Sequence, residues 1–254
     1  MNETQEAADF ASMSLDPART AFFFDFDGTL AEIVDDPKAV TIGDDVRDAL
    51  VAIRDAAGGA LAVISGREIA AIDRFLAPLT LPVGGAHGSE RRGVAGEVHR
   101  AAVDPRDLDR LAERVANFAR GVPGTTVETK RTSVALHYRR NPSAERNCIA
   151  FAEELAGEYA SASLLAGKMV LEFKFSARTK ADVIGDFMAE EPFCGRRPVY
   201  FGDDVTDEDA FRVLPEWDGL AVKIGEGPSI ARYRLADPAA LHAWMKRLAK
   251  GESR

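Results

Sequence analysis

Short apolar runs alternate with amphipathic helical patterns in the first hundred residues of the chain. Apolar runs of strand length occur at residues 21–25, 60–64 and 81–85, and continuous runs of this kind are typical of parallel strands buried on both faces. Apolar residues at helical spacing follow the first two runs: Val46, Leu50 and Ile53, then Ile69, Ile72, Phe75 and Leu76. This alternation predicts an α/β region built on a parallel sheet.

The same alternation resumes near residue 175. The pattern predicts a helix over about 180–190, a strand at 198–202, a short helix from Thr206, a strand at 219–224 and a last helix capped by Asp237-Pro238. The predicted α/β core is therefore built from two separate parts of the chain.

The segment between these parts has a different pattern. A helix is expected from Asp104-Pro105 to Gly121, then strands at 125–129 and 132–138, a second helix capped by Asn141-Pro142, and strands near 163–165 and 169–175. Helices and strand pairs in this order predict an inserted α+β domain. We therefore expect a core of residues 1–98 and 173–254 with a cap of residues 99–172. Residues 1–20 are expected to be a loose leader, weakly helical at best.

The composition is that of an ordinary globular protein, with 46% hydrophobic and 29% charged residues. No apolar stretch approaches the roughly 20 residues of a membrane helix. The acidic, polar first twenty residues do not resemble a signal peptide. Cys148 and Cys194 lack CxxC spacing, so neither a disulfide nor a metal framework is expected. These features predict a cytoplasmic protein with no membrane partner, and they identify no protein partner.

The net charge of −9 argues against a general nucleic-acid binder, which is usually basic. Positive charge is concentrated in residues 120–140, where the single acid Glu128 is outnumbered by Arg120, Lys130, Arg131, Arg139 and Arg140. This segment either supplies positive charge to an anionic ligand or forms a solvated basic face.

Acidic residues directly follow two of the predicted strands. Asp25-Phe26-Asp27-Gly28-Thr29-Leu30 comes after the first strand, and residues 202–209 (GDDVTDED) follow the strand at 198–202. Carboxyl ends of parallel strands meet at one edge of a sheet, where two acidic clusters would repel each other without a cation. Carboxylate oxygens suit Mg²⁺. The alternative, acids that favour a helix N-terminus, accounts for Asp207 to Asp209 but poorly for Asp203 and Asp204.

Two weaker signals accompany the acidic clusters. Ser65-Gly66-Arg67 follows the second predicted strand, where a hydroxyl and backbone N–H groups can hold a phosphate oxygen. A serine that caps a helix would look the same. Lys180 begins a predicted helix, and alone it would be an ordinary surface lysine.

These four segments, in this order, resemble the haloacid dehalogenase (HAD) superfamily of phosphotransferases. The resemblance implies a Rossmann-like core with an inserted cap of the second (C2) type. It also implies an aspartyl-phosphate mechanism. Its residues would be Asp25 as nucleophile, Asp27 as acid/base, Ser65 and Lys180 as phosphoryl clamps, and Asp207 to orient Lys180 or a metal-bound water. Mg²⁺ would be held by Asp203, a carboxylate oxygen of Asp25 and the backbone carbonyl of Asp27.

Three further segments point to one family within this superfamily. Residues 84–90 (GGAHGSE), 128–139 (ETKRTSVALHYR) and 167–172 (GKMVLE) resemble stretches of the trehalose-6-phosphate phosphatase family. The similarity runs from about residue 20 to 245 and implies that substrate is bound by Arg67, His87, Gly88, Glu128, Lys130, Arg139, Lys168 and Glu172. The chain departs from the family around Lys180, because the usual glycines are replaced in Phe175-Ser176-Ala177-Arg178-Thr179-Lys180-Ala181.

The resemblance implies hydrolysis of trehalose 6-phosphate, a small-molecule sugar phosphate, in trehalose biosynthesis. Alternatives within enzymes are a sucrose-phosphate or glycosyl-glycerate-phosphate phosphatase and a phosphosugar mutase. A catalytically dead binding module is another alternative, against which the intact Asp25, Asp27, Lys180 and Asp203 argue. The acids and the phosphoryl clamp lie in the predicted core and the sugar-reading groups in the cap, so the two domains are expected to open and close over the site.

Overall fold

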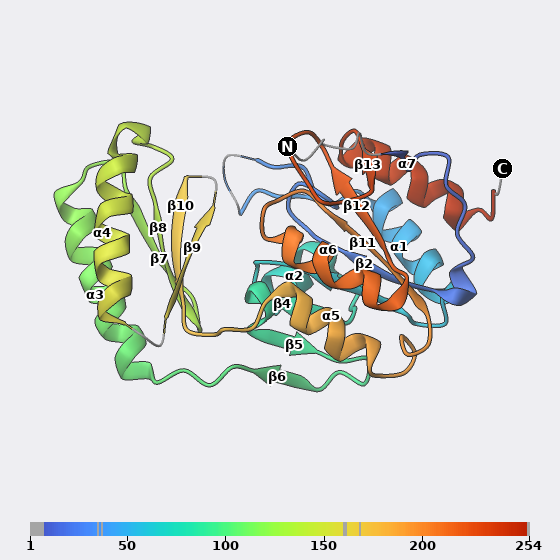
Figure 1. Ribbon diagram of the computed structural model, residues 1–254, viewed down its shortest axis with the longest axis horizontal. Coiled ribbons are helices and arrows are strands. Elements are labelled where there is room, and N and C mark those ends of the chain that lie inside the picture. The colour runs from blue at the N-terminus through green and yellow to red at the C-terminus, as the bar shows by residue number, and fades with distance from the viewer. Residues whose placement is uncertain (1–7, 35, 37, 160–161, 168, 253–254) are drawn as a thin grey trace. The chain divides into compact units, whose positions relative to one another are not determined.

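The structure is a computed structural model that describes residues 8–34, 36, 38–159, 162–167 and 169–252 (Figure 1). The chain divides into two compact units, one formed by Met1–His99 and Arg178–Arg254 and the other by Arg100–Ala177. The second unit ends at Ala177 rather than at the expected residue 172, because strand β10 (Val170–Lys174) belongs to the sheet of that unit. An insertion thus separates the two parts of the larger unit.

Among the described residues, the larger unit is built on a sheet of nine strands. The last strand in the sheet ends at Arg100, the first residue of the smaller unit. The strand order is β1 (Ala8–Asp9), β13 (Tyr233–Leu235), β12 (Leu220–Ile224), β11 (Arg197–Gly202), β2 (Thr20–Phe24), β3 (Leu61–Ile64), β4 (Val83–Gly85), β5 (Glu90–Arg92) and β6 (Val98–Arg100). The pairs from β1 through β4 are parallel, whereas β5 is antiparallel to β4. The predicted parallel sheet is therefore confirmed at its centre and mixed at one edge.

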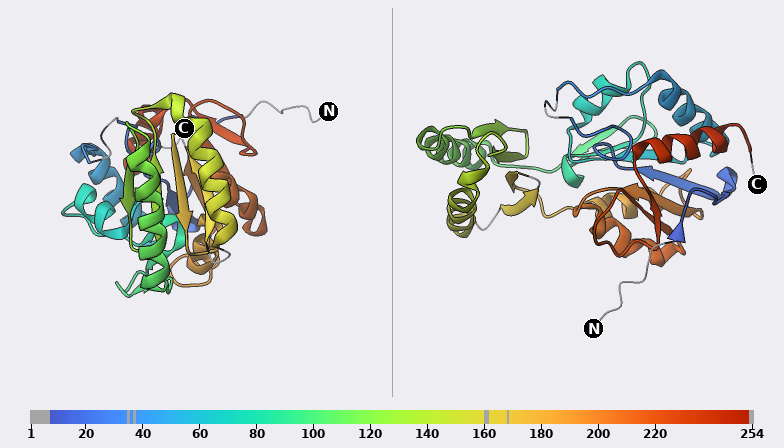
Figure 2. Two further views of the ribbon diagram at one scale, coloured as in Figure 1. Left: turned by 90° about the vertical axis from the view of Figure 1, so that its left-hand side faces the viewer. Right: turned by 90° about the horizontal axis from the view of Figure 1, so that it is seen from above.

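Helices cover both faces of this sheet (Figure 2). Helices α1 (Asp44–Ala56) and α7 (Pro238–Ala249) contact each other on one face, and α5 (Lys180–Met188) and α6 (Asp207–Val213) contact each other on the opposite face. A further helix, α2 (Ile69–Leu76), follows β3. All five residues of β2 are buried, as a strand between two helical layers requires. In the part of the chain that is described, no helix combines the length and the apolar character needed to span a membrane.

The prediction of a loose leader is wrong for the part of it that the structure describes. Strand β1 pairs in parallel with β13, and a short 3₁₀ helix covers Pro17–Arg19. Phe10 follows β1 and is fully buried, with its ring 5.4 Å from that of Phe201 and 5.2 Å from that of Trp244. Burial of a Phe side chain stabilises a fold by roughly 1.5–3 kcal/mol, which is enough to fix this segment against the core.

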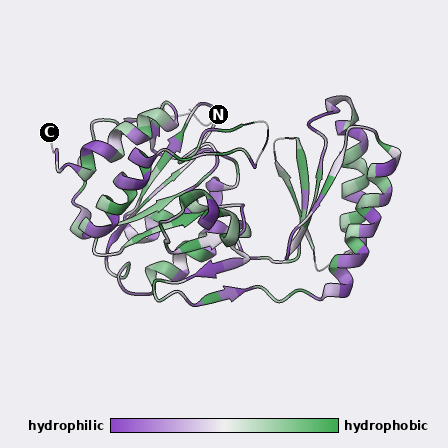
Figure 3. Ribbon diagram, turned by 180° about the vertical axis from the view of Figure 1, so that it is seen from behind, coloured by the Kyte–Doolittle hydropathy of each residue, from purple (hydrophilic) through white to green (hydrophobic). Residues whose placement is uncertain are grey.

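The smaller unit has one sheet and two helices. Its strands run antiparallel in the order β7 (Thr126–Thr129), β8 (Ser133–His137), β10 and β9 (Ser163–Gly167). Helices α3 (Pro105–Gly121) and α4 (Glu145–Glu158) lie side by side on one face, and hydrophilic and hydrophobic residues intersperse along them (Figures 2 and 3). Asn141 is the N-cap residue of a 3₁₀ turn at Pro142–Ala144 that leads directly into α4, but its side chain donates to the carbonyl of Pro123 and makes no capping hydrogen bond.

The two faces of this smaller sheet differ in chemistry. Val134, Leu136, Leu171 and Phe173 pack with residues of α3 and α4 in one apolar cluster. Residues alternate between faces along a strand, so Ala135 lies on the other face together with its register partners Glu128 and Glu172. The side chains of Glu128, Ser133, His137 and Glu172 therefore share a face away from the helices.

Candidate active site

Three parallel strands bring the predicted catalytic residues to one edge of the large sheet. Strand β2 lies between β11 and β3, and the three strands are followed directly by Asp25, Asp203 and Ser65. The amide of Asp25 donates to the carbonyl of Phe201 over 2.8 Å, which fixes the first acid against the neighbouring strand. The expectation that both acidic segments meet at the carboxyl ends of the strands is therefore confirmed.

Lys180 joins the two acidic segments. Its Nζ donates to Oδ1 of Asp25 over 2.7 Å and to Oδ1 of Asp207 over 2.6 Å, and all three side chains are buried. Burial alone would lower the pKa of Lys180, but the adjacent carboxylates of Asp207 and Asp25 raise it well above its ordinary value. The ammonium is therefore fixed as a cation beside Asp25. It is not the surface lysine that the sequence also allowed.

The N-terminus of α5 holds Lys180 in place. Thr179 is the N-cap residue and forms a capping box with Asp182, in which the Thr179 hydroxyl accepts from the amide of Asp182. The Asp182 carboxylate accepts from the amide of Thr179 over 2.7 Å. A reciprocal cap of this kind satisfies backbone donors at the helix start and supplies local rigidity without glycines. Arg178 donates to the carbonyl of Gly88 and pairs with Asp186.

Asp207 is a fully buried carboxylate with three donors. Besides Lys180, Tyr200 donates its hydroxyl to Oδ1 over 2.5 Å and the amide of Asp204 donates to Oδ2 over 2.9 Å. An acid that only favours a helix N-terminus would be exposed, so the helix-dipole alternative does not explain this residue.

The site has a surplus of negative charge that a cation would relieve. One oxygen from each of Asp25, Asp203 and Asp207 lies within 4.8 Å of the others, and the ammonium of Lys180 donates to two of these carboxylates, Asp25 and Asp207. Burial, opposed by Lys180 and assisted by Asp207 and Asp203, raises the pKa of Asp25 well above its ordinary value. Burial and the neighbouring Asp207 and Asp204 raise the pKa of Asp203 to about 7. Such a donor set fits a hard divalent cation.

Two neighbouring residues hold Asp203 close to the first acidic segment. Its carboxylate lies so near Gly28, whose φ is +81°, that a side chain at that position would overlap it. Thr29 donates its hydroxyl to Oδ1 of Asp203 over 3.4 Å. On the other side, Lys223 is buried in β12 and donates to the main-chain carbonyls of Asp203 and Ile224.

Arg67 contacts Asp27. Its Nε and Nη2 lie 2.6 Å from Oδ2 and Oδ1 of Asp27, so both oxygens of the predicted acid/base accept from one guanidinium. The backbone amide of Arg67 donates to Oγ of Ser65 over 3.1 Å. Ser65 is not the N-cap of α2, which begins after Glu68, so the helix-cap alternative for Ser65 is wrong.

His87 and Gly88 lie in a turn packed against Ser65 to Arg67. The amide of His87 donates to the carbonyl of Ser65, and the amide of Ala86 donates to the carbonyl of Arg67. The imidazole lies directly over Gly66. Gly88, at φ +95°, packs so closely on the Thr179 carbonyl that a side chain would overlap it. The turn thus links the Ser65 segment to the start of α5.

In the smaller unit, two of the predicted substrate-binding residues, Lys130 and Glu172, pair with each other, and a third, Glu128, contacts His137. Oε1 of the buried Glu172 accepts from Nζ of Lys130 over 3.0 Å and from Oγ of Ser133 over 2.5 Å. Glu128 contacts the imidazole of His137 over 3.0 Å. Strand alternation does not place Arg139, because β8 ends at His137 and Arg139 is exposed in the following turn. Lys168 lies outside the described residues.

Sequence reasoning missed Tyr200 and Lys223. Each interrupts an apolar strand with a polar group, in residues 198–202 and 220–224, and a buried hydroxyl or ammonium requires a partner. That requirement for a partner could have identified both residues from the sequence.

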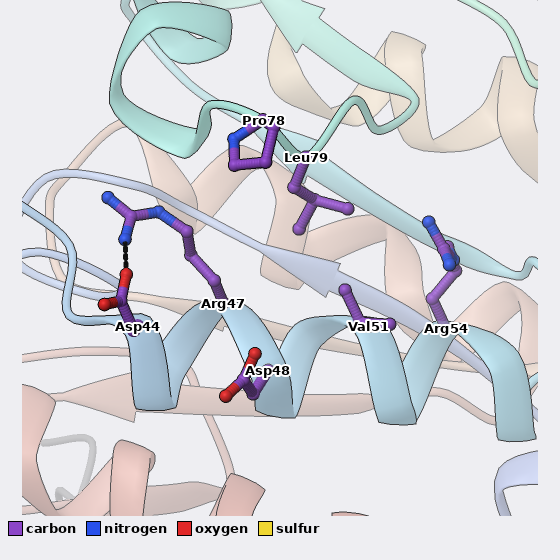
Figure 4. Close-up of a pocket in the computed structure, with 7 residues that line it drawn as sticks. All are labelled: Asp44, Arg47, Asp48, Val51, Arg54, Pro78 and Leu79. Carbon is purple, nitrogen blue, oxygen red and sulfur yellow. Dashed lines mark hydrogen bonds and ion pairs between the residues drawn. The ribbon is translucent and has the colours of Figure 1, made fainter.

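A groove of about 350 Å³ lies between α1 and the segment after α2, away from the candidate active site. Its lining includes Arg47, Arg54 and Leu79 (Figure 4).

Comparison with known proteins identifies the family of this chain. The trehalose-phosphatase family model matches residues 23–239. The chain is 37% identical over 229 residues to trehalose-6-phosphate phosphatase of Escherichia coli (strain K12), a match that covers 90% of this chain and 86% of that protein.

Two solved structures share the fold. The C-terminal domain of C. albicans trehalose-6-phosphate phosphatase is 23% identical, with a TM-score of 0.82 and coverage of 91% of this chain and 92% of that one. A phosphatase of the haloalkanoate (HAD) superfamily from Bacteroides thetaiotaomicron is 13% identical, with a TM-score of 0.62 and coverage of 92% and 95%. The family model and the E. coli relative show that this chain belongs to the trehalose-phosphatase family, on a HAD-type fold.

Proposed function

We propose that this chain hydrolyses trehalose 6-phosphate to trehalose and inorganic phosphate. The observation that carries the proposal is the buried ammonium of Lys180 between Asp25 and Asp207, in a member of the trehalose-phosphatase family. An ammonium held at this point can take a phosphoryl oxygen while Asp25 attacks phosphorus. The alternatives of sucrose-phosphate or glycosyl-glycerate-phosphate hydrolysis, mutase activity and a dead binding module have no support in the comparisons.

The proposed reaction has two steps at Asp25. In the first, a carboxylate oxygen of Asp25 bonds to phosphorus, the bond from phosphorus to the sugar oxygen breaks, and Asp27 gives a proton to that oxygen. In the second, water attacks phosphorus, the bond to Asp25 breaks, and Asp27 takes the proton of the water. Ser65 and Lys180 hold the phosphoryl oxygens throughout, and Asp207 holds Lys180 by its buried hydrogen bond.

We propose Mg²⁺ as the cofactor, held by carboxylate oxygens of Asp25 and Asp203 and by the main-chain carbonyl of Asp27. When bound, such an ion offsets phosphoryl charge. Asp207 belongs to the same acidic cluster, but its oxygens accept from Lys180, Tyr200 and the Asp204 amide. We therefore assign it to Lys180 and not to the ion. The free thiols of Cys148 and Cys194 are compatible with the cytoplasmic location that we expect.

We propose that the smaller unit recognises the sugar. Glu172 can accept hydrogen bonds from sugar hydroxyls but cannot favour a dianionic phosphate. Lys130 neutralises it and can donate in its turn. Glu128, His137 and Arg139 add polar groups of both signs to the same unit. Because Asp25 belongs to one unit and Glu172 to the other, the substrate must contact both units during turnover, which is the basis of the expected opening and closing.

Release of inorganic phosphate from a panel of sugar phosphates tests the proposal. We expect trehalose 6-phosphate to be hydrolysed with a kcat/KM well above those for sucrose 6-phosphate and glucose 6-phosphate, in the presence of Mg²⁺. A wide preference for either of the other two sugars would refute the substrate and leave the phosphatase chemistry intact. An absence of phosphate release from every member of the panel would refute the activity itself.

A further inference from the structure

The guanidinium of Arg67 is fixed between a carboxylate and an aromatic surface. On one side it spans both oxygens of Asp27, each over 2.6 Å. On another side its Cζ lies 4.8 Å from the ring centroid of Phe75 and 5.8 Å from that of Phe26. The two rings stack on each other, with centroids 5.6 Å apart and planes 24° apart. We call Phe26, Phe75 and Arg67 the aromatic–arginine stack.

The parts of the stack come from three different segments. Phe26 lies between the two aspartates of the first acidic segment, Arg67 follows Ser65, and Phe75 lies in α2. Phe26 is fully buried and Phe75 is 7% exposed, so their rings form a fixed surface. A guanidinium is planar, stacks on aromatic rings and offers two parallel N–H donors, and the combination holds a carboxylate in one orientation.

We propose that the aromatic–arginine stack is a positioning device for Asp27, and that Phe75 acts on proton transfer through Arg67 without touching the substrate. This inference depends on the proposed role of Asp27 as acid/base. Asp27 is only partly buried, so its side chain has room to rotate unless something holds it. Fixing both oxygens by a fork of two donors removes that rotation. A lysine at position 67 could hold only one oxygen.

A positioning role for Arg67 and a phosphate-binding role predict different effects of its loss on different substrates. If Arg67 mainly bound the phosphoryl group, its loss would damage every phosphate monoester equally. If it positions the proton donor, the damage depends on how much help the leaving oxygen needs. A nitrophenolate leaves without a proton, whereas an alkoxide from an alkyl or sugar phosphate does not.

The test compares leaving groups of similar size in the full chain with Mg²⁺. We would measure kcat/KM for 4-nitrophenyl, phenyl and benzyl phosphate with the wild type, Arg67→Met, Arg67→Lys and Phe75→Leu. Proton transfer contributes typically ~10²–10⁴-fold, so partial loss of positioning in Arg67→Met should cost about tenfold or more with benzyl phosphate and only about twofold with 4-nitrophenyl phosphate. Arg67→Lys and Phe75→Leu should show the same trend to a smaller degree.

Two controls make the result decisive. Arg74 also stacks on Phe75, at 4.9 Å, but it is exposed on α2, so Arg74→Met should leave the leaving-group dependence unchanged. In an Asp27→Asn background, Arg67→Met should add little, because the amide at position 27 can no longer give or take a proton.

Equal losses with all three esters, or a full further loss in the Asp27→Asn background, would overturn the positioning role. If Asp27→Asn itself shows no dependence on the leaving group, the proposed acid/base role fails instead. Thermal unfolding of each variant reports whether a loss has a structural origin, and the ratio between esters is unaffected by the fraction of folded protein.

Discussion

The two units of the molecule use acidic residues in opposite ways. In the larger unit, the carboxylates of Asp25, Asp203 and Asp207 lie close together and the ammonium of Lys180 binds only two of them, so negative charge is concentrated at this point. In the smaller unit, the carboxylate of Glu172 is matched by the ammonium of Lys130 and accepts a hydrogen bond from Ser133. An unbalanced centre attracts a cation and supports chemistry on a charged group. A balanced centre is suited to neutral hydroxyls, to which it offers donors and acceptors without a net field.

This difference has an energetic basis. Uncompensated buried charge is expensive, because the interaction with water is lost and repulsion is strong at low dielectric. The core therefore carries an electrostatic cost that a bound cation would offset, and the raised pKa values of Asp25 and Asp203 reflect this cost. No comparable cost is expected where acid and base are paired.

The largest effect is expected at the nucleophile. Asp25→Asn keeps the shape of the side chain but removes the attacking anion, so turnover of trehalose 6-phosphate and of 4-nitrophenyl phosphate should both fall by more than about 10³-fold. Asp48→Asn, the same change at an exposed position of α1, is the matched control and should retain full activity. Wild-type rates in Asp25→Asn would mean that another group attacks phosphorus.

Removal of divalent cations should have a comparable effect on activity. Excess chelator should abolish phosphate release from both substrates, and added Mg²⁺ should restore it, since the surplus charge lies at the centre common to both reactions. Isothermal titration of the metal-free chain should show a binding event that Asp203→Asn weakens. Full turnover in excess chelator would contradict the proposed requirement for a divalent cation.

A smaller and selective loss is expected from the balanced centre. Glu172→Ala should reduce kcat/KM for trehalose 6-phosphate by about 10²-fold or more, because the sugar hydroxyls lose a hydrogen-bond acceptor in the site that binds them. The same change should barely affect 4-nitrophenyl phosphate, which lacks a sugar. Glu153→Ala, at an exposed position of α4 in the same unit, is the control. Equal losses on both substrates would make Glu172 a structural residue.

The smallest effect concerns the stability of the metal-free protein. The folded-state pKa of Asp203, about 7, lies above its ordinary value of 3.8, so between these values the folded chain binds more protons than the unfolded chain. The contribution of Asp203 to the free energy of unfolding should therefore be fully present below pH 4 and decline as pH rises to about 7. The check is denaturant unfolding in chelator across pH 4–8, where Asp203→Asn should decline less than the wild type. Identical slopes would contradict the raised pKa.

The central strands have clear hydrophobic patterns and could be predicted from the sequence, whereas the shortest strands have no such pattern and were not predicted. Strands β2, β3 and β11 are continuous apolar runs and lie where they were expected. Strands β1, β5, β6 and β13 have two or three residues each, too few for a periodic pattern to be visible. They form because a neighbouring strand offers unpaired backbone groups, which is a property of the assembled sheet.

The candidate site divides in the same way. Asp25, Asp203 and Lys180 follow strands or begin helices, so the rule for strand ends was enough to bring them together. The contact of Arg67 with Asp27, and that of Tyr200 with Asp207, depends on side-chain direction across separate elements. Arg139 shows the limit of alternation, since the period of two no longer applies once β8 has ended at His137.

The most direct test of the central claim, that the unbalanced centre forms a phosphoryl bond at Asp25, is a rapid-quench experiment with Asp27→Asn. 4-Nitrophenyl phosphate needs no proton donor to react, whereas water needs a base to release the phosphoryl group, so the covalent intermediate should persist. We predict a burst of one nitrophenolate per site, with phosphate on Asp25 in the tryptic peptide of residues 20–38. A quench with no burst and no modified Asp25, or with phosphate on another residue, would contradict the account.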